Sequence, residues 1–437
     1  MNREQAENYI YASYMRASEN LDYEAKDACK RNPTLSRAII RKRCATPCVV
    51  VTGSKGKGSV SCMVSQILRT KLDVGLMTSP HIANFCERFR VNGVQMSDEA
   101  FVAHLERIRP EFDTVQAKLS PSEFISPIAI QTALALDFFN AQTTQFNVFE
   151  CGKGAQYDDA NNVLHDYAII NTIFAEHTRE LGESISDIAR DKSHVITGEQ
   201  RCAYIAEQSD ETMAEITHRA IEQGVPLKVY GRDFWCENVR YTRSGMRFDV
   251  VIEGVRYEDI LVPLLGEHQA KNCALAMALC VDVLGELDIE AVKQNLSTMS
   301  WPGRMELLSA EPFVMLDACI NAASTEAVKQ TLDFLGIERY AVVVGIPDDK
   351  GYADVVRSMS EEASRVILTK SQNPHYLFTE RQCEVLLKDG IDAVLTSSVE
   401  EAITLAVAET GAAVVLGTTS VVAEVEGYFC TIRDIAQ

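Results

Sequence analysis

The first half of the chain alternates between short apolar runs and longer stretches with helical periodicity. Apolar runs of four to eight residues are typical of buried strands, and longer periodic stretches are typical of helices. The strand-like runs are VVV (49–51), VGLMTS (74–79), FNVFEC (146–151) and YAIINTIF (167–174), and the helical stretches include 131–142 and 185–196. Strands separated by helices predict a parallel sheet with crossover connections, so this half is expected to be an α/β domain.

Two features interrupt that alternation. Residues 227–264 alternate apolar and polar positions around short turns, which predicts a small antiparallel hairpin insertion, and a long apolar helix is expected over 266–285. WPGR (301–304) then punctuates the chain before a second strand–helix series begins. We therefore expect a second, smaller α/β domain of the Rossmann-like type over 301–437.

The second series contains five strand-like runs and three helix starts. The strands are expected at 313–318, 340–346, 365–370, 392–397 and 412–418, and the helices from Ser324, Tyr352 and Val399.

Composition indicates an ordinary globular protein of two or three domains, because 46% of the 437 residues are hydrophobic and 24% are charged. No apolar stretch approaches the roughly 20 residues that span a bilayer, and the N-terminus is charged where a signal peptide needs an apolar core. The expectation is a cytoplasmic protein without a membrane partner. A net charge of −20 argues against general nucleic-acid binding.

The thirteen cysteines are scattered singly and form no C-x-x-C motif. The closest pair, Cys44 and Cys48, lacks a second pair. This pattern predicts free thiols in a reducing compartment rather than zinc ligands or disulfides.

Residues 26–43 are basic, with seven cations against the single acid Asp27. The cations are Lys26, Lys30, Arg31, Arg37, Arg41, Lys42 and Arg43. Such a run is either a solvated helix face or a docking site for a polyanionic substrate.

The segment VVVTGSKGKGSV (49–60) reads as a strand, a glycine loop and the start of a helix. That arrangement places backbone N–H groups and a helix N-terminus around a phosphate. Lys57 would supply a cation to the β and γ phosphates, and Ser59 a hydroxyl to Mg²⁺. The sequence therefore predicts nucleotide binding by the loop residues Gly53, Ser54, Lys55, Gly56, Lys57, Gly58 and Ser59.

Polar residues stand at the ends of the other predicted strands: Ser79, Glu150 and the pair Glu176–His177. Ligands of open parallel sheets bind at the carboxyl ends of the strands, so these side chains are expected near the phosphate loop.

Six blocks, in order, resemble the Mur ligase superfamily and most closely its folylpolyglutamate synthases. They are VTGSKGKGS (51–59), GLMTSPHIANFCERFRVNG (75–93), ECGKGAQYDDANN (150–162), EHTRELGESISDIARDKSHVI (176–196), GEHQAKNCALAMAL (266–279) and WPGRMELL (301–308). The resemblance implies a Mur-ligase-like α/β fold. An N-terminal P-loop ATPase domain would occupy 1–300 and a C-terminal ligase domain 301–437.

The resemblance also implies ATP-dependent, ADP-forming amide ligation through an acyl phosphate, with ATP and Mg²⁺ as cofactors. The implied partners are a small-molecule carboxylic acid, either folate or a non-folate acid, and an amino acid such as glutamate. It does not indicate the oligomeric state.

Residue roles carry over by the same resemblance. By this carry-over Ser59 and Ser79 would help hold one Mg²⁺, and Glu150 and His177 a second; the oxygen ligands among them are of the hard type that suits this ion. Lys192 matches a lysine that is often carbamylated, and carbamylation turns the side chain into an anionic ligand. The catalytic residues that the resemblance implies are Lys57, His177 and Lys192. Asn272 matches an adenine-contacting position, Arg304 a phosphate-contacting hinge position, and Asp317 a nucleotide-binding position.

Two motif positions in the expected C-terminal domain depart from the family pattern. Ile320 replaces a histidine that contacts the nucleotide, and Gly351 replaces an aspartate. Isoleucine cannot donate a hydrogen bond. These departures keep a second interpretation open, in which the chain is a nucleotide-binding pseudo-ligase that acts as a partner or regulator.

Overall fold

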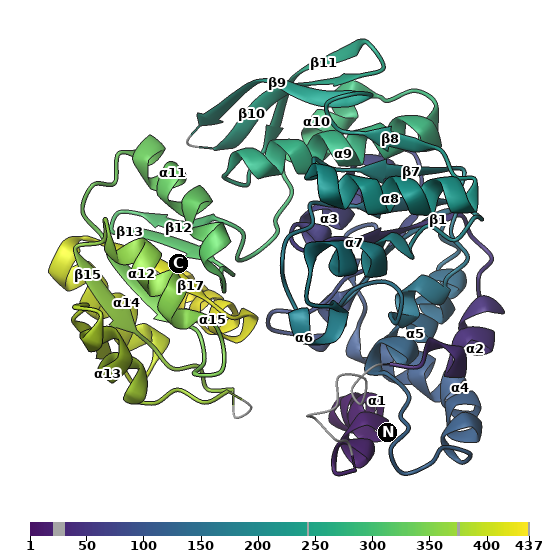
Figure 1. The fold of residues 1–437 in the computed structure, drawn as a ribbon, viewed down its shortest axis with the longest axis horizontal. Helices are drawn as coiled ribbons and strands as arrows, with labels where there is room; N and C mark the ends of the chain where they lie inside the picture. Colours follow the sequence, from purple (N-terminus) through teal and green to yellow (C-terminus); the bar gives the residue numbers. More distant parts are fainter. Residues whose placement is uncertain (21–30, 243, 374–375, 436–437) are drawn as a thin grey trace.

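The computed structural model describes residues 1–20, 31–242, 244–373 and 376–435. These form a larger lobe with an eight-stranded sheet and a three-stranded sheet, and a smaller lobe with a six-stranded sheet (Figure 1). Two α/β units with a small antiparallel insertion were predicted, and this architecture is confirmed.

The eight-stranded sheet is parallel except at one edge, where β3 and β4 run antiparallel. In sheet order its strands are β4 (Val94–Gln95), β3 (Phe89–Val91), β2 (Val74–Met77), β5 (Phe146–Glu150), β1 (Cys48–Thr52), β6 (Tyr167–Ile170), β7 (Cys202–Ile205) and β8 (Leu227–Val229). Successive side chains of the central strand β1 face opposite cores: Val50 packs in one, Val49 and Val51 in the other. A strand buried on both faces explains the continuous apolar run in the sequence.

Helices cover both faces of this sheet. One face packs against α1 (Arg3–Ser18), α2 (Arg37–Arg41), α4 (Asp98–Gln116), α5 (Pro127–Ala141), α7 (Ile185–Ser193) and α8 (Asp210–Gln223), with the 3-10 segment Asp159–Asn162. The other packs against α3 (Lys57–Leu68), α9 (Glu267–Leu284) and α10 (Ile289–Ser297). Helix α6 (Thr178–Leu181) and the 3-10 segments Pro33–Leu35 and Phe85–Arg88 complete the lobe.

The antiparallel insertion is a three-stranded meander of β9 (Phe234–Thr242), β10 (Gly245–Ile252) and β11 (Val255–Val262). The predicted insertion began at residue 227, which is wrong for its first strand. Leu227–Val229 pairs in parallel with β7 and forms the edge of the large sheet. A strand of three partly buried residues is too short for its hydrophobic pattern to distinguish a parallel edge strand from a strand of an antiparallel hairpin. The preceding helix α8 supplies the crossover that makes the pairing parallel.

The smaller lobe contains β12 (Glu306–Ala310), β13 (Phe313–Asp317), β17 (Ala412–Gly417), β14 (Ala341–Gly345), β15 (Arg365–Leu368) and β16 (Ala393–Leu395), in sheet order. Its helices are α11 (Thr325–Leu335), α12 (Tyr352–Ser360), α13 (Arg381–Lys388), α14 (Val399–Thr410) and α15 (Thr419–Ile435), and Ala322–Ser324 is a 3-10 turn. The five predicted strands are confirmed. Strand β12, which is antiparallel to β13, was missed because its residues are mostly partly buried and show no clear apolar run.

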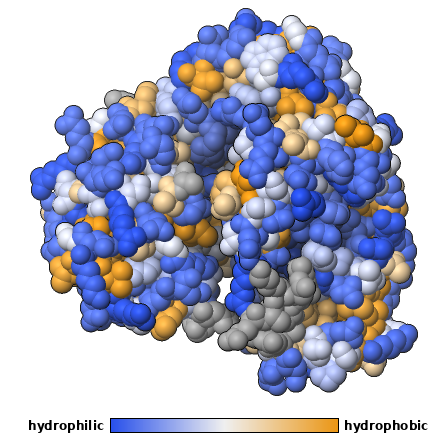
Figure 2. Space-filling model, viewed as in Figure 1, coloured by the Kyte–Doolittle hydropathy of each residue, from blue (hydrophilic) through white to orange (hydrophobic). Residues whose placement is uncertain are grey.

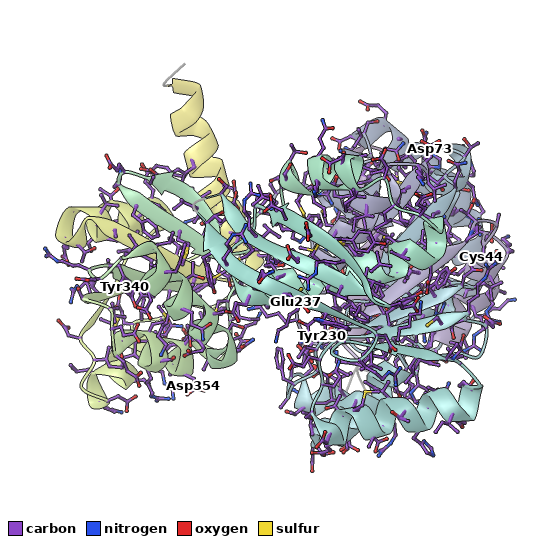
Figure 3. All side chains as sticks on the ribbon, turned by 90° about the horizontal axis from the view of Figure 1, so that it is seen from above. Cys44, Asp73, Tyr230, Glu237, Tyr340 and Asp354 are labelled. Carbon is purple, nitrogen blue, oxygen red and sulfur yellow. The ribbon has the colours of Figure 1, made fainter. Side chains whose placement is uncertain are left out.

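The meander also contacts the smaller lobe. Tyr241 of β9 stacks on Phe334 of α11 with ring centroids 4.8 Å apart. Seen from above, Glu237 of β9 lies near the junction of the lobes, whereas Tyr340 and Asp354 belong to the smaller lobe (Figure 3). Among the described residues no helix has the length and apolar character required to cross a membrane.

Candidate active site

Strand register brings the polar strand ends together. The pairing of β1 with β5 places Glu150 beside Val51, two residues before Gly53. Strand β2 lies on the other side of β5, and the Ser79 N–H that follows it donates to Glu150 Oε2 at 2.9 Å. Ser79 and Glu150 therefore lie together at the carboxyl edge of the sheet, as predicted.

The phosphate loop joins β1 to α3 and depends on two glycines with positive φ. Gly53 has φ 144° and Gly56, which precedes the helix, has φ 76°. A Cβ on Gly56 would lie 2.4 Å from Asn171 Nδ2, so the loop is packed closely against the residue that follows β6. The first N–H groups of α3 have no acceptor within the helix and form a cradle for an anion.

Two lysines meet at this loop. Lys57 Nζ donates to the Gly53 carbonyl at 2.8 Å, and Lys192 Nζ donates to the same oxygen at 2.9 Å. Lys192 Nζ also donates to Glu176 Oε1 at 2.9 Å. Lys192 lies in a charged stretch of sequence that suggests a solvated position, yet its residue is only 1% exposed.

Burial lowers the pKa of Lys192, and the charge of Lys57 lowers it further, whereas Glu176 opposes both. The surroundings of Lys192 therefore favour its neutral, nucleophilic amine more strongly than solvent does for an exposed lysine.

The groups predicted to hold Mg²⁺ on the sheet side fit a hard cation. Within the described chain, the buried Ser59 Oγ has no hydrogen-bond partner. Glu150 is buried, and burial raises its pKa to about 6 although the Lys57 charge acts in the opposite direction. Its Oε2 would lie 3.5 Å from a Cβ placed on Gly58. An unpaired hydroxyl and a desolvated carboxylate at a phosphate loop are suitable Mg²⁺ ligands.

His177 belongs to a different cluster. Its Nε2 lies 3.8 Å from Glu176 Oε2, and the other charges acting on it are Lys153, Glu180 and Lys192. Burial lowers the pKa of His177, which favours the neutral imidazole that binds metals. The two clusters connect at Gly53, through Lys57 and Lys192.

No group of three or more His, Cys, Asp or Glu side chains in the described ranges is arranged to hold a metal ion. A Mg²⁺ ion here would depend on serine hydroxyls, nucleotide phosphates and water besides one carboxylate, which matches its usual mode of binding.

The predicted adenine-contacting residue lies beside the loop. Asn272 of α9 accepts a hydrogen bond from Asn171 Nδ2 at 2.9 Å and donates to Gln269 Oε1 at 3.1 Å. Its Oδ1 would lie 3.0 Å from a Cβ on Gly56. Lys55 acts on the neighbouring His268: burial, aided by the Lys55 charge, lowers the pKa of His268 to about 4.

The two predicted site residues near the hinge, Arg304 and Asp317, make different contacts. Arg304 Nη1 donates to the Gly303 carbonyl at 2.9 Å, and its charge acts on Glu150. Asp317 is buried and accepts the Met305 N–H at 2.8 Å, so it fixes the backbone of the hinge. The predicted contact of Asp317 with the nucleotide stays a prediction.

A cavity of about 270 Å³ lies between the lobes beside this site. Gly58, Glu150 and Arg304 line it from the loop and hinge, and Thr419 and Glu426 of α15 line it from the smaller lobe. On the face shown in Figure 2, a furrow separates the two lobes. The candidate site therefore opens into a cavity that both lobes line.

The basic segment is largely occupied by contacts within the larger lobe. Lys26, Asp27 and Lys30 lie outside the described residues. Arg31 pairs with Asp158 at 2.7 Å, and Lys42 and Arg43 both pair with Glu111. Arg37 Nε donates to Asn162 at 3.2 Å, and Arg41 is exposed. The described part of this segment therefore serves mainly to attach it to the lobe, which does not favour a polyanion site.

Sequence reasoning left out two residues of the site, Asn171 and Trp301. Asn171 follows β6, so its position at a strand end was the signal that could have found it. Trp301 was interpreted only as part of a hinge, but its ring would lie 3.2 Å from a Cβ on Gly58. No sequence pattern indicates that contact, because it joins residues more than 200 positions apart.

Family models match both parts of the chain. The Mur ligase middle domain matches residues 51–280, and the glutamate ligase domain of Mur ligases matches residues 303–419. The chain therefore belongs to the Mur ligase family. Within that family it groups with folylpolyglutamate synthases, as the sequence blocks indicated.

Individual relatives agree with this placement. The dihydrofolate synthase/folylpolyglutamate synthase of Bacillus subtilis is 30% identical over 72% of this chain and 74% of that protein. A probable bifunctional folylpolyglutamate synthase/dihydropteroate synthase of Haloferax volcanii is 29% identical over 84% of this chain. The chain spans only 42% of the length of that bifunctional relative.

Among solved structures, the Mycobacterium tuberculosis folylpolyglutamate synthase complexed with ADP superposes with a TM-score of 0.84. The two are 25% identical, and the match covers 96% of this chain and 99% of the other. The predicted Mur-ligase-like fold is therefore confirmed.

Proposed function

We propose that this chain is an ATP-dependent, ADP-forming ligase that joins a carboxylic acid to the amino group of an amino acid. The observation that carries the proposal is the cluster of Lys57, the unpaired hydroxyl of Ser59 and the buried carboxylate of Glu150 at the phosphate loop. It stands beside a cavity large enough for a substrate. The match to the glutamate ligase domain and the folylpolyglutamate synthase names of the relatives support the same reaction.

In the proposed reaction, a carboxylate oxygen of the acid attacks the γ-phosphorus of ATP and ADP leaves. The amino group then attacks the acyl carbon of the acyl phosphate, loses a proton and displaces phosphate. Because charge gathers on the transferring phosphoryl group, the protein acts mainly through positioning and cations. Lys57 is assigned to the β and γ phosphates, together with the loop N–H groups.

Bound Mg²⁺ would neutralise phosphate charge. We assign Ser59, Ser79 and Glu150 to Mg²⁺ and keep His177 as a further ligand. Lys192 is assigned a carbamate: its neutral amine would attack CO₂ and lose a proton, which yields an anionic ligand. Its lowered pKa supports that assignment.

For the nucleotide, Asn272 is assigned to the adenine side and Arg304 to the phosphates. Asp317 acts by holding the hinge backbone through Met305. We propose residues 1–300 as the ATP-binding domain and residues 301–437 as the ligase domain. A hinge arginine on ATP would couple closure of these domains to nucleotide binding and exclude water from the acyl phosphate.

For substrates, we propose glutamate as the amino acid and folate as the first acid to test, since the relatives are named for these reactions. A non-folate acid is the second choice. The cytoplasm is the proposed compartment, and the free thiols of the cysteines from Cys44 to Cys383 support it. The pseudo-ligase interpretation has no support among the relatives.

The test is release of ADP from ATP and Mg²⁺ in the presence of folate and glutamate. The wild type should form ADP only when both substrates are present, and Lys57→Ala should abolish turnover. If ATP binds but neither folate nor any other acid yields ADP with glutamate, the ligase proposal is wrong and the pseudo-ligase interpretation replaces it.

A further inference from the structure

The cavity between the lobes is lined by an arginine whose side chain forms no ion pair within the described part of the chain. Arg90 lies on the short strand β3 and is paired in register with Gln95 of β4, and both residues line the cavity. Across the described ranges the Arg90 side chain makes no ion pair and no hydrogen bond, and its guanidinium lies 5.2 Å above the centre of the Trp301 ring. A partly buried guanidinium without a protein acceptor is available to a ligand that supplies acceptor oxygens to its five donors.

The neighbouring acid is already occupied. Glu87 acts electrostatically on Arg90, but its carboxylate accepts three backbone N–H groups. These belong to Ile82, Ala83 and Asn84, at 2.9, 3.1 and 2.7 Å. Glu87 therefore serves to hold the turn before β3 and is not a partner for the guanidinium.

Arg88, two residues earlier, differs from Arg90 in that its side chain has hydrogen-bond partners within the protein. It is buried, and it donates from Nε to His81 Nδ1 and from Nη1 to Gln131 Oε1, both at 2.9 Å. The donors of Arg88 are used inside the larger lobe, whereas those of Arg90 face the cavity.

Trp301 connects Arg90 to the reaction centre. Its ring lies against Gly58 of the phosphate loop, where an added Cβ would be 3.2 Å from Cζ2 and Nε1. The Arg90 guanidinium lies over the same ring. The indole therefore lies between the arginine and the loop, and its ring face attracts the guanidinium through a cation–π contact.

We propose that Arg90, stacked on Trp301, is a specificity-determining residue that binds a non-reacting carboxylate of a substrate while the reacting end lies at the phosphate loop. This inference rests on the proposed ligase function. A guanidinium fork matches a carboxylate in a bidentate arrangement. The carboxylate comes either from the amino acid or from the acid substrate, and binding measurements separate these sources.

The experiment measures binding without turnover. Protein loaded with ADP and Mg²⁺ is titrated calorimetrically with L-glutamate and, separately, with folate, for the wild type and Arg90→Gln. We expect Kd for one of the two ligands to rise at least tenfold in Arg90→Gln, while Kd for ADP stays unchanged. A rise for glutamate assigns the carboxylate to the amino acid, and a rise for folate assigns it to the acid.

Two further variants control this result. Arg90→Lys keeps the charge and should recover part of the affinity. Arg69→Gln removes a matched charge at the end of α3, where Arg69 donates to the Asn92 carbonyl, and should bind like the wild type. A second readout uses Trp235→Phe, which leaves Trp301 as the single tryptophan, so that its fluorescence reports on ligand at Arg90.

The outcomes separate the two proposals. If neither ligand binds, or if both bind Arg90→Gln as tightly as the wild type, the carboxylate subsite is wrong whatever the enzyme does. If affinity depends on Arg90 but no ADP is released in turnover, the subsite stands and the ligase function fails.

Discussion

Lys57 and Lys192 donate to the same acceptor, the carbonyl oxygen of Gly53, at 2.8 and 2.9 Å. Two ammonium groups on one oxygen repel each other unless one is neutral or an anion lies between them. Burial lowers the pKa of Lys192, and the Lys57 charge adds to that effect. The pair concentrates positive charge where the phosphate loop begins. The shared acceptor also links the phosphate loop to the Glu176–His177 segment, which lies more than 100 residues later in the sequence.

The first prediction concerns carbamylation of Lys192. Because its amine is buried with a lowered pKa, removing bicarbonate and CO₂ from the assay should reduce the rate of ADP release, and added bicarbonate should restore it. Lys192→Gln should lose at least 100-fold in kcat and show no response to bicarbonate. Lys71→Gln, at an exposed surface, is the control and should behave like the wild type. Equal rates in CO₂-free and bicarbonate buffers would exclude a carbamate.

The second prediction separates function from stability at Ser59. Since the buried Ser59 Oγ is unpaired in the described structure, Ser59→Ala relieves a desolvation cost of about 1–3 kcal/mol, and Tm should stay constant or rise. Turnover should nevertheless fall at least 100-fold because a Mg²⁺ ligand is lost. Ser61→Ala removes a second buried, unpaired hydroxyl of the same helix and should leave turnover unchanged. Similar rates for both variants would exclude Ser59 from the metal site.

The third prediction uses two glycines with similar backbone angles. Gly56 has φ 76° and Gly224 has φ 68°, but only Gly56 has atoms near the position of a Cβ. Gly224→Ala should cost only the left-handed strain of about 1–2 kcal/mol. Gly56→Ala should cost more, because its Cβ meets Asn171, and should weaken ADP binding in a calorimetric titration. Equal losses of stability and intact ADP binding would contradict the packed loop.

The fourth prediction is a pH dependence of stability at Asp159. Burial raises the pKa of Asp159 to about 6, while a hydrogen bond from Ser36 opposes the shift. Between pH 3.8 and about 6 the folded protein therefore binds more protons than the unfolded chain, and stability falls as pH rises. Asp159→Asn mimics the protonated form and should be more stable at pH 7 by up to about 3 kcal/mol. The gain should vanish below pH 3.8.

Urea unfolding at several pH values checks this difference. Asp158→Asn is the matched control, because Asp158 accepts from Arg31 and from three backbone N–H groups and should be destabilised by the loss of charge. A pH-independent effect of Asp159→Asn would show that burial does not perturb this carboxyl.

Much of this site followed from sequence because strand ends converge in a parallel sheet. Glu150 and Ser79 were found from their positions after apolar runs, and the register of β1, β5 and β2 brings them together. Lys192 could be found only through the family resemblance, since its own surroundings in sequence are charged. Its burial results from the packing of α7 against the loop, which local pattern does not encode.

Other features depended on contacts that no local pattern specifies. The basic segment reads as a free charged face, but distant acids such as Asp158 and Glu111 neutralise much of its described part. Arg90 is one of many arginines in the sequence. Only the approach of Trp301 from the hinge to Gly58 makes it a candidate for substrate binding.

The most direct test of the ligase proposal is to follow ¹⁸O from the carboxylate of the acid substrate. Folate labelled with ¹⁸O in its reacting carboxylate is incubated with ATP, Mg²⁺, glutamate and enzyme, and the released phosphate is analysed by mass spectrometry. Acyl-phosphate chemistry predicts one ¹⁸O in each phosphate, in equal amount to the amide formed. Release of phosphate that lacks ¹⁸O, or of ADP without amide, would contradict it.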